Sequence, residues 1–206
     1  MNRIIAIDGP TASGKGTLAK KIANYLHLPY LNTGGLYRTI ALYMINNNLD
    51  YNKKEEVINI LDKVDFNDLE NPNLYVEEVG SVAGKIAVIN EVRQFLFEFQ
   101  KNFAYQDSGA VLDGRDIGTV ICPDAKYKFY VTASLEERAK RRFEEMKLKN
   151  KNVSFDEIFT VLKDRDERDT KRANSPLKKA EDAIEIDTTN MNKDEVFKYV
   201  LSMIKI

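Results

Sequence analysis

The stretch Asp8-Gly9-Pro10-Thr11-Ala12-Ser13-Gly14-Lys15-Gly16-Thr17 decides the fold of this chain. It follows a short apolar run, Ile4–Ile7, and precedes residues whose apolar positions repeat with helical spacing. A strand, a glycine-rich turn and a helix in this order form a phosphate-binding P-loop, because backbone N–H groups and the positive end of the helix face the anion. Gly9 and Gly14 let the backbone wrap closely around phosphates, and Lys15 adds a mobile cation. The stretch therefore predicts a site for a nucleoside triphosphate.

The position of the hydroxyl residue narrows the kind of P-loop. In the usual pattern a Ser or Thr follows the lysine directly, whereas here Gly16 intervenes and the hydroxyl comes at Thr17. This ending resembles that of nucleoside monophosphate kinases rather than that of GTPases or motor ATPases. The alternative is a turn that links strand and helix and binds nothing. That alternative requires the glycines, the lysine, the hydroxyl and both flanking elements to coincide by chance.

Composition limits the class of protein further. The chain has 206 residues, enough for one substantial core, and no long polar linker divides it. Its formal net charge is −1, so bulk charge gives no argument for binding to nucleic acid or to a membrane. The single cysteine, Cys122, excludes a disulfide framework, and we expect a buried, inert thiol. We expect no signal peptide and no membrane helix, and hence a cytoplasmic protein.

Apolar runs and helical patterns alternate along the chain. Strands are predicted at Ile4–Ile7, Pro29–Leu31, Ala110–Leu112, Phe129–Val131 and Ala183–Ile186. Helices are predicted from the P-loop to His27 and at Leu36–Ile45, Lys54–Val64, Val88–Tyr105, Leu135–Lys149, Phe155–Asp169 and Asp194–Ile204. Alternation of this kind predicts an α/β fold with a parallel sheet flanked by helices.

Two segments interrupt the alternation. Between residues 65 and 84 the pattern degrades, and the short run Leu74-Tyr75-Val76 predicts one strand of a small antiparallel element inserted into the parallel core. The stretch 147–152 is polar and basic without an apolar face, so it is either a solvated connection or the tip of a mobile lid. After it, Ser154 and Glu157 have the spacing of a capping box that opens the next helix.

The charged residues favour phosphoryl transfer over histidine-centred catalysis. Transfer between two phosphates needs positioning and charge neutralisation more than a general base, and guanidinium groups bind phosphate bidentately. The chain has one histidine and many arginines. The candidate phosphate ligands, with surface solvation as the alternative for each, are Arg38, Arg93, Arg115, Arg138, Arg141, Arg142, Arg165, Arg168 and Arg172.

Two further motifs have residues suited to this chemistry. Asp113-Gly114-Arg115-Asp116 follows a predicted strand, and ligands of open parallel sheets bind at the carboxyl ends of strands. Its first carboxylate suits a metal-bound water, its guanidinium a phosphate and its second carboxylate the amino group of a base, whereas the alternative is a tight turn with a local ion pair. Arg165 and Asp169 lie four residues apart, on one face of a predicted helix, with Arg172 three residues beyond. Alone, this second motif would indicate a salt-bridged surface.

Four motifs in order give the chain its family resemblance. They are the loop Gly9–Thr17, the stretch Asn32-Thr33-Gly34-Gly35-Leu36-Tyr37-Arg38, the stretch Asp113-Gly114-Arg115-Asp116-Ile117-Gly118-Thr119, and Arg165–Arg172 with Ser175-Pro176-Leu177. Together they resemble the bacterial cytidylate kinases, P-loop kinases with a five-stranded parallel sheet, a small monophosphate-binding insert and a short lid. The resemblance implies one domain over residues 1–206, with a core at about 1–32, 106–137 and 173–206, an insert at about 33–105 and a lid at about 138–165.

The resemblance implies a role for each matched residue. ATP would bind the loop residues Gly9, Pro10, Thr11, Ala12, Ser13, Gly14, Lys15, Gly16 and Thr17. CMP or dCMP would bind Thr33, Tyr37, Arg38, Arg93, Arg115, Asp116, Arg165, Asp169 and Arg172. Catalysis would fall to Lys15, Arg115, Arg142 and Arg172, and Thr17 would hold Mg²⁺, largely through water. Arg93 and Asp116 would read cytosine, because the carboxylate accepts from the amino group that uracil lacks.

One part of the chain departs from the family pattern. Family members carry a longer insert, with an Ile-Arg-Thr-x-Glu-Val-like strand and a Ser shortly before the base-reading Arg. Here Tyr75-Val76-Glu77-Glu78-Val79 passes directly into Gly80-Ser81-Val82-Ala83-Gly84, and Gly84 stands where that Ser would be. One expected contact to cytosine is therefore absent, unless Ser81 supplies it from a shifted position.

These observations predict an ATP-dependent kinase of CMP and dCMP that uses Mg²⁺ and acts as a monomer. Within the same class, the alternative is a kinase for another acceptor, such as UMP or a small metabolite. From another class, the alternative is a nucleotide-hydrolysing switch, but the run nearest to a guanine-reading motif, Asn192-Lys193-Asp194-Glu195, ends in Glu. Nucleic-acid binding through the basic cluster Lys147–Lys151 is disfavoured, because the cluster has no interleaved aromatic residues.

Overall fold

The computed structural model describes residues 3–148 and 153–205 of the chain. The chain forms two compact units. Unit 1 consists of Met1–Tyr30 and Ala104–Ile206, and unit 2 is the intervening segment Leu31–Phe103. No helix in the described ranges is long and apolar enough to cross a membrane.

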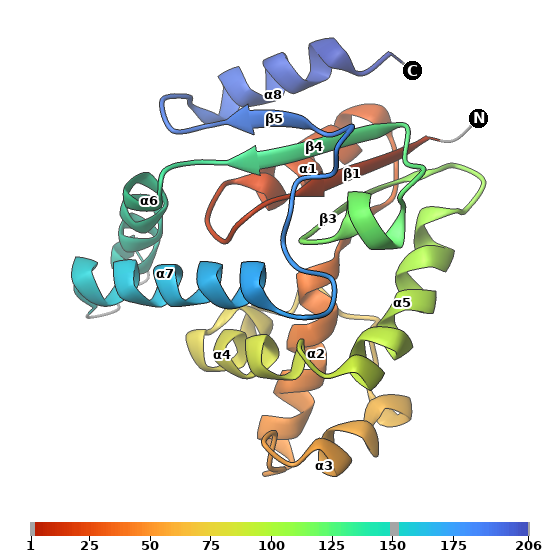
Figure 1. Ribbon diagram of the computed structural model, residues 1–206, viewed down its shortest axis with the longest axis vertical. Coiled ribbons are helices and arrows are strands. Elements are labelled where there is room, and N and C mark those ends of the chain that lie inside the picture. Colours follow the sequence, from red (N-terminus) through yellow and green to blue (C-terminus); the bar gives the residue numbers. More distant parts are fainter. Residues whose placement is uncertain (1–2, 149–152, 206) are drawn as a thin grey trace. The chain divides into compact units, whose positions relative to one another are not determined.

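The strands form one sheet with the order β2-β3-β1-β4-β5, in which β3, β1, β4 and β5 are labelled in Figure 1. Their bounds are Ile4–Asp8 for β1, Tyr30–Asn32 for β2, Ala110–Gly114 for β3, Tyr127–Thr132 for β4 and Ile184–Asp187 for β5. β1 is fully buried between β3 and β4 and runs parallel to both, which explains its uninterrupted apolar run. The predicted five-stranded parallel sheet is confirmed.

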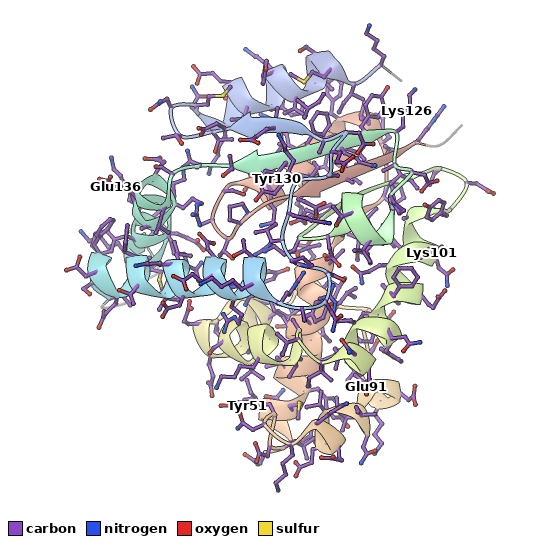
Figure 2. The ribbon with its side chains drawn as sticks, in the orientation of Figure 1. Tyr51, Glu91, Lys101, Lys126, Tyr130 and Glu136 are labelled. Atoms are coloured by element: carbon purple, nitrogen blue, oxygen red, sulfur yellow. The ribbon has the colours of Figure 1, made fainter. Side chains whose placement is uncertain are left out.

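Register places the carboxyl ends of the central strands at one edge of the sheet. Asp8, the last residue of β1, pairs with Gly114 of β3 and with Tyr130 of β4. Tyr130 is labelled on β4 in Figure 2. The P-loop after β1 and the segment after β3 therefore leave the sheet side by side. This arrangement follows from parallel pairing alone and creates the setting for a ligand site.

Helices complete unit 1. Their bounds are Lys15–Leu26 for α1, Ile117–Ile121 for the π-helical turn η3, Leu135–Leu148 for α6, Phe155–Lys171 for α7 and Lys193–Met203 for α8. Leu18 and Ile22 of α1 pack with Ile5, Phe129 and Val200 in the main core. α6 packs against α7 (Figure 1). The predicted capping box at the start of α7 is confirmed, since Ser154 accepts from the Glu157 N–H and the Glu157 carboxylate accepts from the Ser154 N–H.

Unit 2 is almost entirely helical. Its elements are α2 at Thr33–Asn46, α3 at Lys54–Ile58, the 3₁₀ turn η1 at Leu61–Lys63, the 3₁₀ turn η2 at Pro72–Tyr75, α4 at Glu77–Ile86 and most of α5 at Asn90–Ala104. α2 packs against α4 and η2. Leu36 and Ile40 of α2 and Ile86 of α4 are completely buried, so unit 2 has an apolar centre of its own.

The structure corrects two local predictions. The run Leu74-Tyr75-Val76 is not a strand, because Leu74 and Tyr75 end η2 and Val76 is the N-cap of α4. The segment Lys54–Val64 is not one helix but α3 followed by η1. The first predicted helix ends where it was expected, at about His27, which is the C-cap of α1 and has φ +53°. Of the basic stretch 147–152, residues 149–152 lie outside the described ranges, as does the predicted helix end at Lys149.

Candidate active site

The P-loop joins β1 to α1 in a conformation that needs glycine at two positions. A Cβ on Gly9 would lie 2.0 Å from the Val131 carbonyl oxygen, and Gly14, the N-cap of α1, has φ +88°. α1 has neither a side-chain cap nor an acidic residue in its first turn. Its first N–H groups therefore keep their capacity for an external acceptor, as a helix N-terminus that binds an anion requires.

Lys15 lies folded into this loop. Its side chain is buried, and its ammonium donates to the Pro10 carbonyl oxygen at 3.1 Å. Burial, together with the positive charge of Arg115, lowers the pKa of Lys15 from 10.5 to about 7. A bound phosphate would raise the pKa of Lys15 again, because its negative charge stabilises the ammonium form.

Asp113, at the end of β3, presents a carboxylate beside the start of α1. The Tyr30 hydroxyl donates to Asp113 Oδ1 at 2.7 Å. The other oxygen, Oδ2, lies 3.6 Å from where a Cβ on Gly16 would be. Burial raises the pKa of Asp113, against the opposing effect of the nearby Lys15 charge. The Tyr30 hydroxyl thus orients the Asp113 carboxylate, which lies beside Gly16, the residue that precedes Thr17 in the sequence.

Arg115 joins the segment after β3 to both the P-loop and α7. Its Nη2 donates to Thr11 Oγ1 at 2.7 Å, and its Nε donates to Asp169 Oδ2 at 2.9 Å. Burial alone would raise the pKa of Asp169, but the charges of Arg115 and Arg165 lower it below its ordinary value. Asp169 is therefore an ionised carboxylate at neutral pH, and it orients the Arg115 guanidinium beside the phosphate loop.

Arg172 and Asp116 form the next pair along the same side. Arg172 Nη2 lies 3.7 Å from Asp116 Oδ1, and both side chains are less than a tenth exposed. Arg172 Nε donates to the Ser175 carbonyl oxygen at 2.6 Å. Residues predicted to act together are thus close in unit 1: Thr11, Arg115 and Asp169 are linked by hydrogen bonds, and Arg172 is paired with Asp116.

Two arginines of α6 have different surroundings. Arg138 is buried and donates to the carbonyl oxygens of Ala133 and Thr11 and to both carboxylate oxygens of Asp166, the shortest of these at 2.6 Å. Its guanidinium therefore links α6, the P-loop and α7. Arg142, predicted to be catalytic, lies on α6 with its Nη1 donating to Glu145 at 2.9 Å.

Arg165 lies on α7 in unit 1, and unit 2 carries the remaining predicted substrate residues. Arg38 Nη1 donates to the Leu74 carbonyl oxygen at 2.7 Å, and its guanidinium lies over the Tyr75 ring. Arg93 Nη1 donates to the Ala87 carbonyl oxygen at 3.2 Å, and its guanidinium lies 5.9 Å from the centroid of the Tyr37 ring. Tyr37 and Arg38 thus lie on α2, and Arg93 lies on α5. Thr33, the first residue of α2, is buried.

Sequence reasoning missed several residues that shape unit 1. Asp8 is buried and accepts two backbone N–H groups after Asp116. Tyr30 holds Asp113, and Asp166 holds Arg138. The only signal for Asp8 was its place at the end of a buried strand, where a charged residue needs partners. Tyr30 and Asp166 gave no signal, because their partners are distant in sequence.

A parallel sheet with a glycine-rich loop after β1, a buried lysine in that loop and arginines hydrogen-bonded around it defines a P-loop kinase. The sequence profile of the cytidylate kinase family matches residues 5–206. A cytidylate kinase of Bartonella tribocorum (strain CIP 105476 / IBS 506) is 45% identical over 201 residues, which cover 98% of this chain and 94% of the relative. One of Agrobacterium fabrum (strain C58 / ATCC 33970) is 44% identical over 204 residues, covering 99% and 97%.

A solved structure supports the fold independently. The crystal structure of an uncharacterized protein from Eubacterium ventriosum ATCC 27560 matches with a TM-score of 0.55 at 18% identity, covering 98% of this chain and 99% of the other. The family profile and the relatives span nearly the whole chain. The chain belongs to the cytidylate kinase family.

Proposed function

We propose that this protein transfers the γ-phosphoryl group of ATP to the phosphate of CMP or dCMP, forming CDP or dCDP. The observation that carries the proposal is the hydrogen bond of Arg115 to Thr11 of the P-loop, in a chain of the cytidylate kinase family. It holds a guanidinium beside the loop that binds phosphates, where charge develops during transfer. No general base is needed, because the attacking phosphate is largely ionised at neutral pH.

The P-loop binds the phosphates of ATP. The backbone N–H groups of the loop Gly9–Thr17, Pro10 excepted, and the uncapped start of α1 donate to the phosphate oxygens, and Lys15 turns its ammonium from Pro10 to the phosphates. Arg115, Arg142 and Arg172 stabilise the transferred group. Arg115 donates a hydrogen bond to Asp169, and Arg172 donates one to the Ser175 carbonyl oxygen. Both guanidinium groups are therefore oriented before the substrate binds.

CMP is the phosphoryl acceptor in this proposal. Thr33, Arg38, Arg115 and Arg172 bind its phosphate, and Tyr37 lines its pocket. Arg165 and Asp169 bind the ribose, and the ionised Asp169 accepts a hydrogen bond from a sugar hydroxyl.

Arg93 and Asp116 read the cytosine base in this proposal. Asp116 accepts from the amino group of cytosine, and uracil presents a carbonyl oxygen there, which repels a carboxylate. Ser81 and Gly84, the two positions in question for a further base contact, both lie on α4, and Ser81 is exposed. Selectivity for cytosine over uracil therefore rests mainly on Asp116 and Arg93.

The donor atoms near Thr17 suit a magnesium ion. Mg²⁺ prefers oxygen ligands and keeps several waters, and the Thr17 hydroxyl and the Asp113 carboxylate supply such oxygens. The Tyr30 hydroxyl and the neighbouring Gly16 leave Asp113 directed at the start of α1. Thr17 would hold the ion directly or through water, and Asp113 would hold it through water. When bound, the ion neutralises charge on the phosphates.

We further propose that residues 138–165 form the lid that excludes water during transfer, so that ATP is not lost to hydrolysis. In the same division of the chain, the core comprises residues at about 1–32, 106–137 and 173–206, and the monophosphate-binding insert comprises residues at about 33–105. We also propose that the protein acts as a monomer in the cytoplasm, with nucleotides as its only ligands besides Mg²⁺.

A coupled assay of ADP release tests the proposed function. Mg-ATP is supplied with CMP, dCMP, UMP, AMP, GMP or shikimate, beside a control without acceptor. We expect release with CMP and dCMP far above release with UMP. Equal rates with CMP and UMP would show that the shortened insert has relaxed base selection. ADP release that no acceptor changes would favour a nucleotide-hydrolysing switch and contradict the kinase.

ATP binding is expected to take up a proton at Lys15. Because the pKa of this buried lysine is about 7 without nucleotide, most of it is neutral at pH 8, and the phosphates restore the charged form. Uptake at pH 8 is then about one proton per ATP, and it declines as the pH falls through 7 toward 6, where Lys15 is already charged. Titration calorimetry in buffers of different ionisation enthalpy measures it. A binding heat at pH 8 that is the same in every buffer would contradict the low pKa.

A further inference from the structure

Asp8 ends β1 with a buried carboxylate whose two oxygens both accept backbone hydrogen bonds. Oδ1 accepts from the Ile117 N–H at 2.9 Å, and Oδ2 accepts from the Gly118 N–H at 2.8 Å. The side chain belongs to a residue that is only 5% exposed. Although Asp8 opens the P-loop in sequence, its carboxylate is therefore directed at η3 and not at the phosphate-binding turn.

The donors of these bonds are the first N–H groups of η3, which have no partner within the turn. The residue in the N-cap position, Asp116, makes no side-chain cap. Asp8 supplies the cap instead, from the neighbouring strand, which the register of Asp8 with Gly114 makes possible. The Asp116 side chain is thereby left to face Arg172.

The cap fixes the segment that lies between two anchored points. Gly114 is held in β3 by pairing with Asp8, and Ile117 and Gly118 are held by the Asp8 carboxylate. Only Arg115 and Asp116 lie between these points. We propose that Asp8 is a positioning residue that sets the backbone of Arg115 and Asp116, and through it the placement of their side chains toward CMP. This inference rests on the proposed function, because it takes the roles of Arg115 and Asp116 from it.

Burial and hydrogen bonding act in opposite directions on the Asp8 carboxyl group. Burial raises the pKa of Asp8 to about 7, against the lowering effect of the two N–H groups. The charged and titratable groups that face it are Arg115 and Asp116 from the segment after β3 and Tyr130 from β4. The two N–H bonds therefore offset part of the cost of burying the ionised form.

The variant Asp8→Asn tests the inference, since its amide can accept only one of the two N–H groups. We expect kcat/KM for CMP to fall about tenfold to a hundredfold, as small misplacements of catalytic groups do. The dissociation constant for ATP should stay within about threefold, since the P-loop N–H groups and Lys15 are unchanged. Hydrogen exchange of the Ile117 and Gly118 amides, followed by NMR without nucleotide, should become faster.

Two further variants support the comparison. Asp65→Asn is the matched control, because Asp65 accepts a backbone N–H from Asn67 in an exposed loop and should leave all three measurements unchanged. Gly118→Ala adds a methyl group beside the same contact, since its Cβ would lie in van der Waals contact with Asp8 Oδ2 at 3.5 Å and would crowd Lys128 Cδ at 3.2 Å. It should lower kcat/KM for CMP in the same direction, and it serves as the test if Asp8→Asn does not fold.

The outcomes separate the inference from the proposed function. If Asp8→Asn weakens ATP and CMP equally, or changes neither, positioning by Asp8 is wrong. If the wild-type protein phosphorylates no CMP, the proposed function fails, while the exchange of the Ile117 and Gly118 amides still shows whether Asp8 holds η3. Unchanged exchange in the variant would overturn the inference whatever the activity.

Discussion

Replacing Lys15 by methionine is expected to lower kcat about a thousandfold, the largest effect of any single substitution proposed for this chain. Lys15 is the only side-chain cation that the P-loop itself supplies, and methionine keeps the length and apolar stem of the lysine while removing its charge. The positive ammonium group stabilises the negative charge on the phosphoryl group during transfer. Loss of the ammonium group therefore raises the barrier to transfer more than it weakens the binding of ATP.

Steady-state kinetics with saturating Mg-ATP and CMP measure this effect. The control is Lys20→Met, because Lys20 is an exposed residue of the same helix and should keep wild-type turnover. Lys15→Met also removes a charge from a buried position, so this variant should not unfold at a lower temperature than the wild type. A Lys15→Met protein with turnover within about tenfold of the wild type would remove Lys15 from the phosphate site.

Arg38→Ala is expected to lower kcat/KM for CMP at least about a hundredfold and to leave ATP binding nearly intact. Arg38 lies on α2, where its Nη1 donates to the Leu74 and Val76 carbonyl oxygens and its guanidinium lies over Tyr75. A phosphate of CMP would gain a bidentate, charge-assisted partner in this guanidinium, and alanine offers none.

Kinetics with varied CMP and a separate titration with ATP distinguish the two affinities. Arg3→Ala makes the same substitution at an exposed arginine of unit 1 and should behave like the wild type. Equal losses for CMP and ATP in Arg38→Ala would place Arg38 in the donor site or in folding. Circular dichroism separates these two, since a folding defect lowers the helical signal of the protein, whereas the loss of a binding contact does not.

The fold of the central sheet was predictable because its physical determinants are local. β1 is a continuous apolar run because it is buried on both faces. The turn after it has glycines at positions 9 and 14, where the backbone of a P-loop requires them. Unit 2 was less predictable. Leu74-Tyr75-Val76 alternates like a strand, but Pro72 at the start of η2, capped by Asn71, and the acidic first turn of α4 are helix signals that outweigh three residues of alternation.

The candidate site was predictable only where a motif carries its residues together. The loop around Lys15 and the Arg115-Asp116 segment are such motifs, and their closeness follows from parallel strands ending at one edge. Contacts between residues far apart in sequence were not predictable. Arg138 with Asp166, and Asp8 with Ile117, depend on how helices and strands pack, and no local pattern records that packing.

The central claim is that a phosphoryl group passes from ATP to CMP, and its most direct test follows the group itself. ATP labelled with ³²P in the γ-position is incubated with the protein, Mg²⁺ and CMP, and the nucleotides are separated by chromatography. The account predicts that the label moves into CDP, and that it moves far more slowly with Arg38→Ala and Lys15→Met. Label found only in inorganic phosphate, at a rate that CMP does not change, would contradict it.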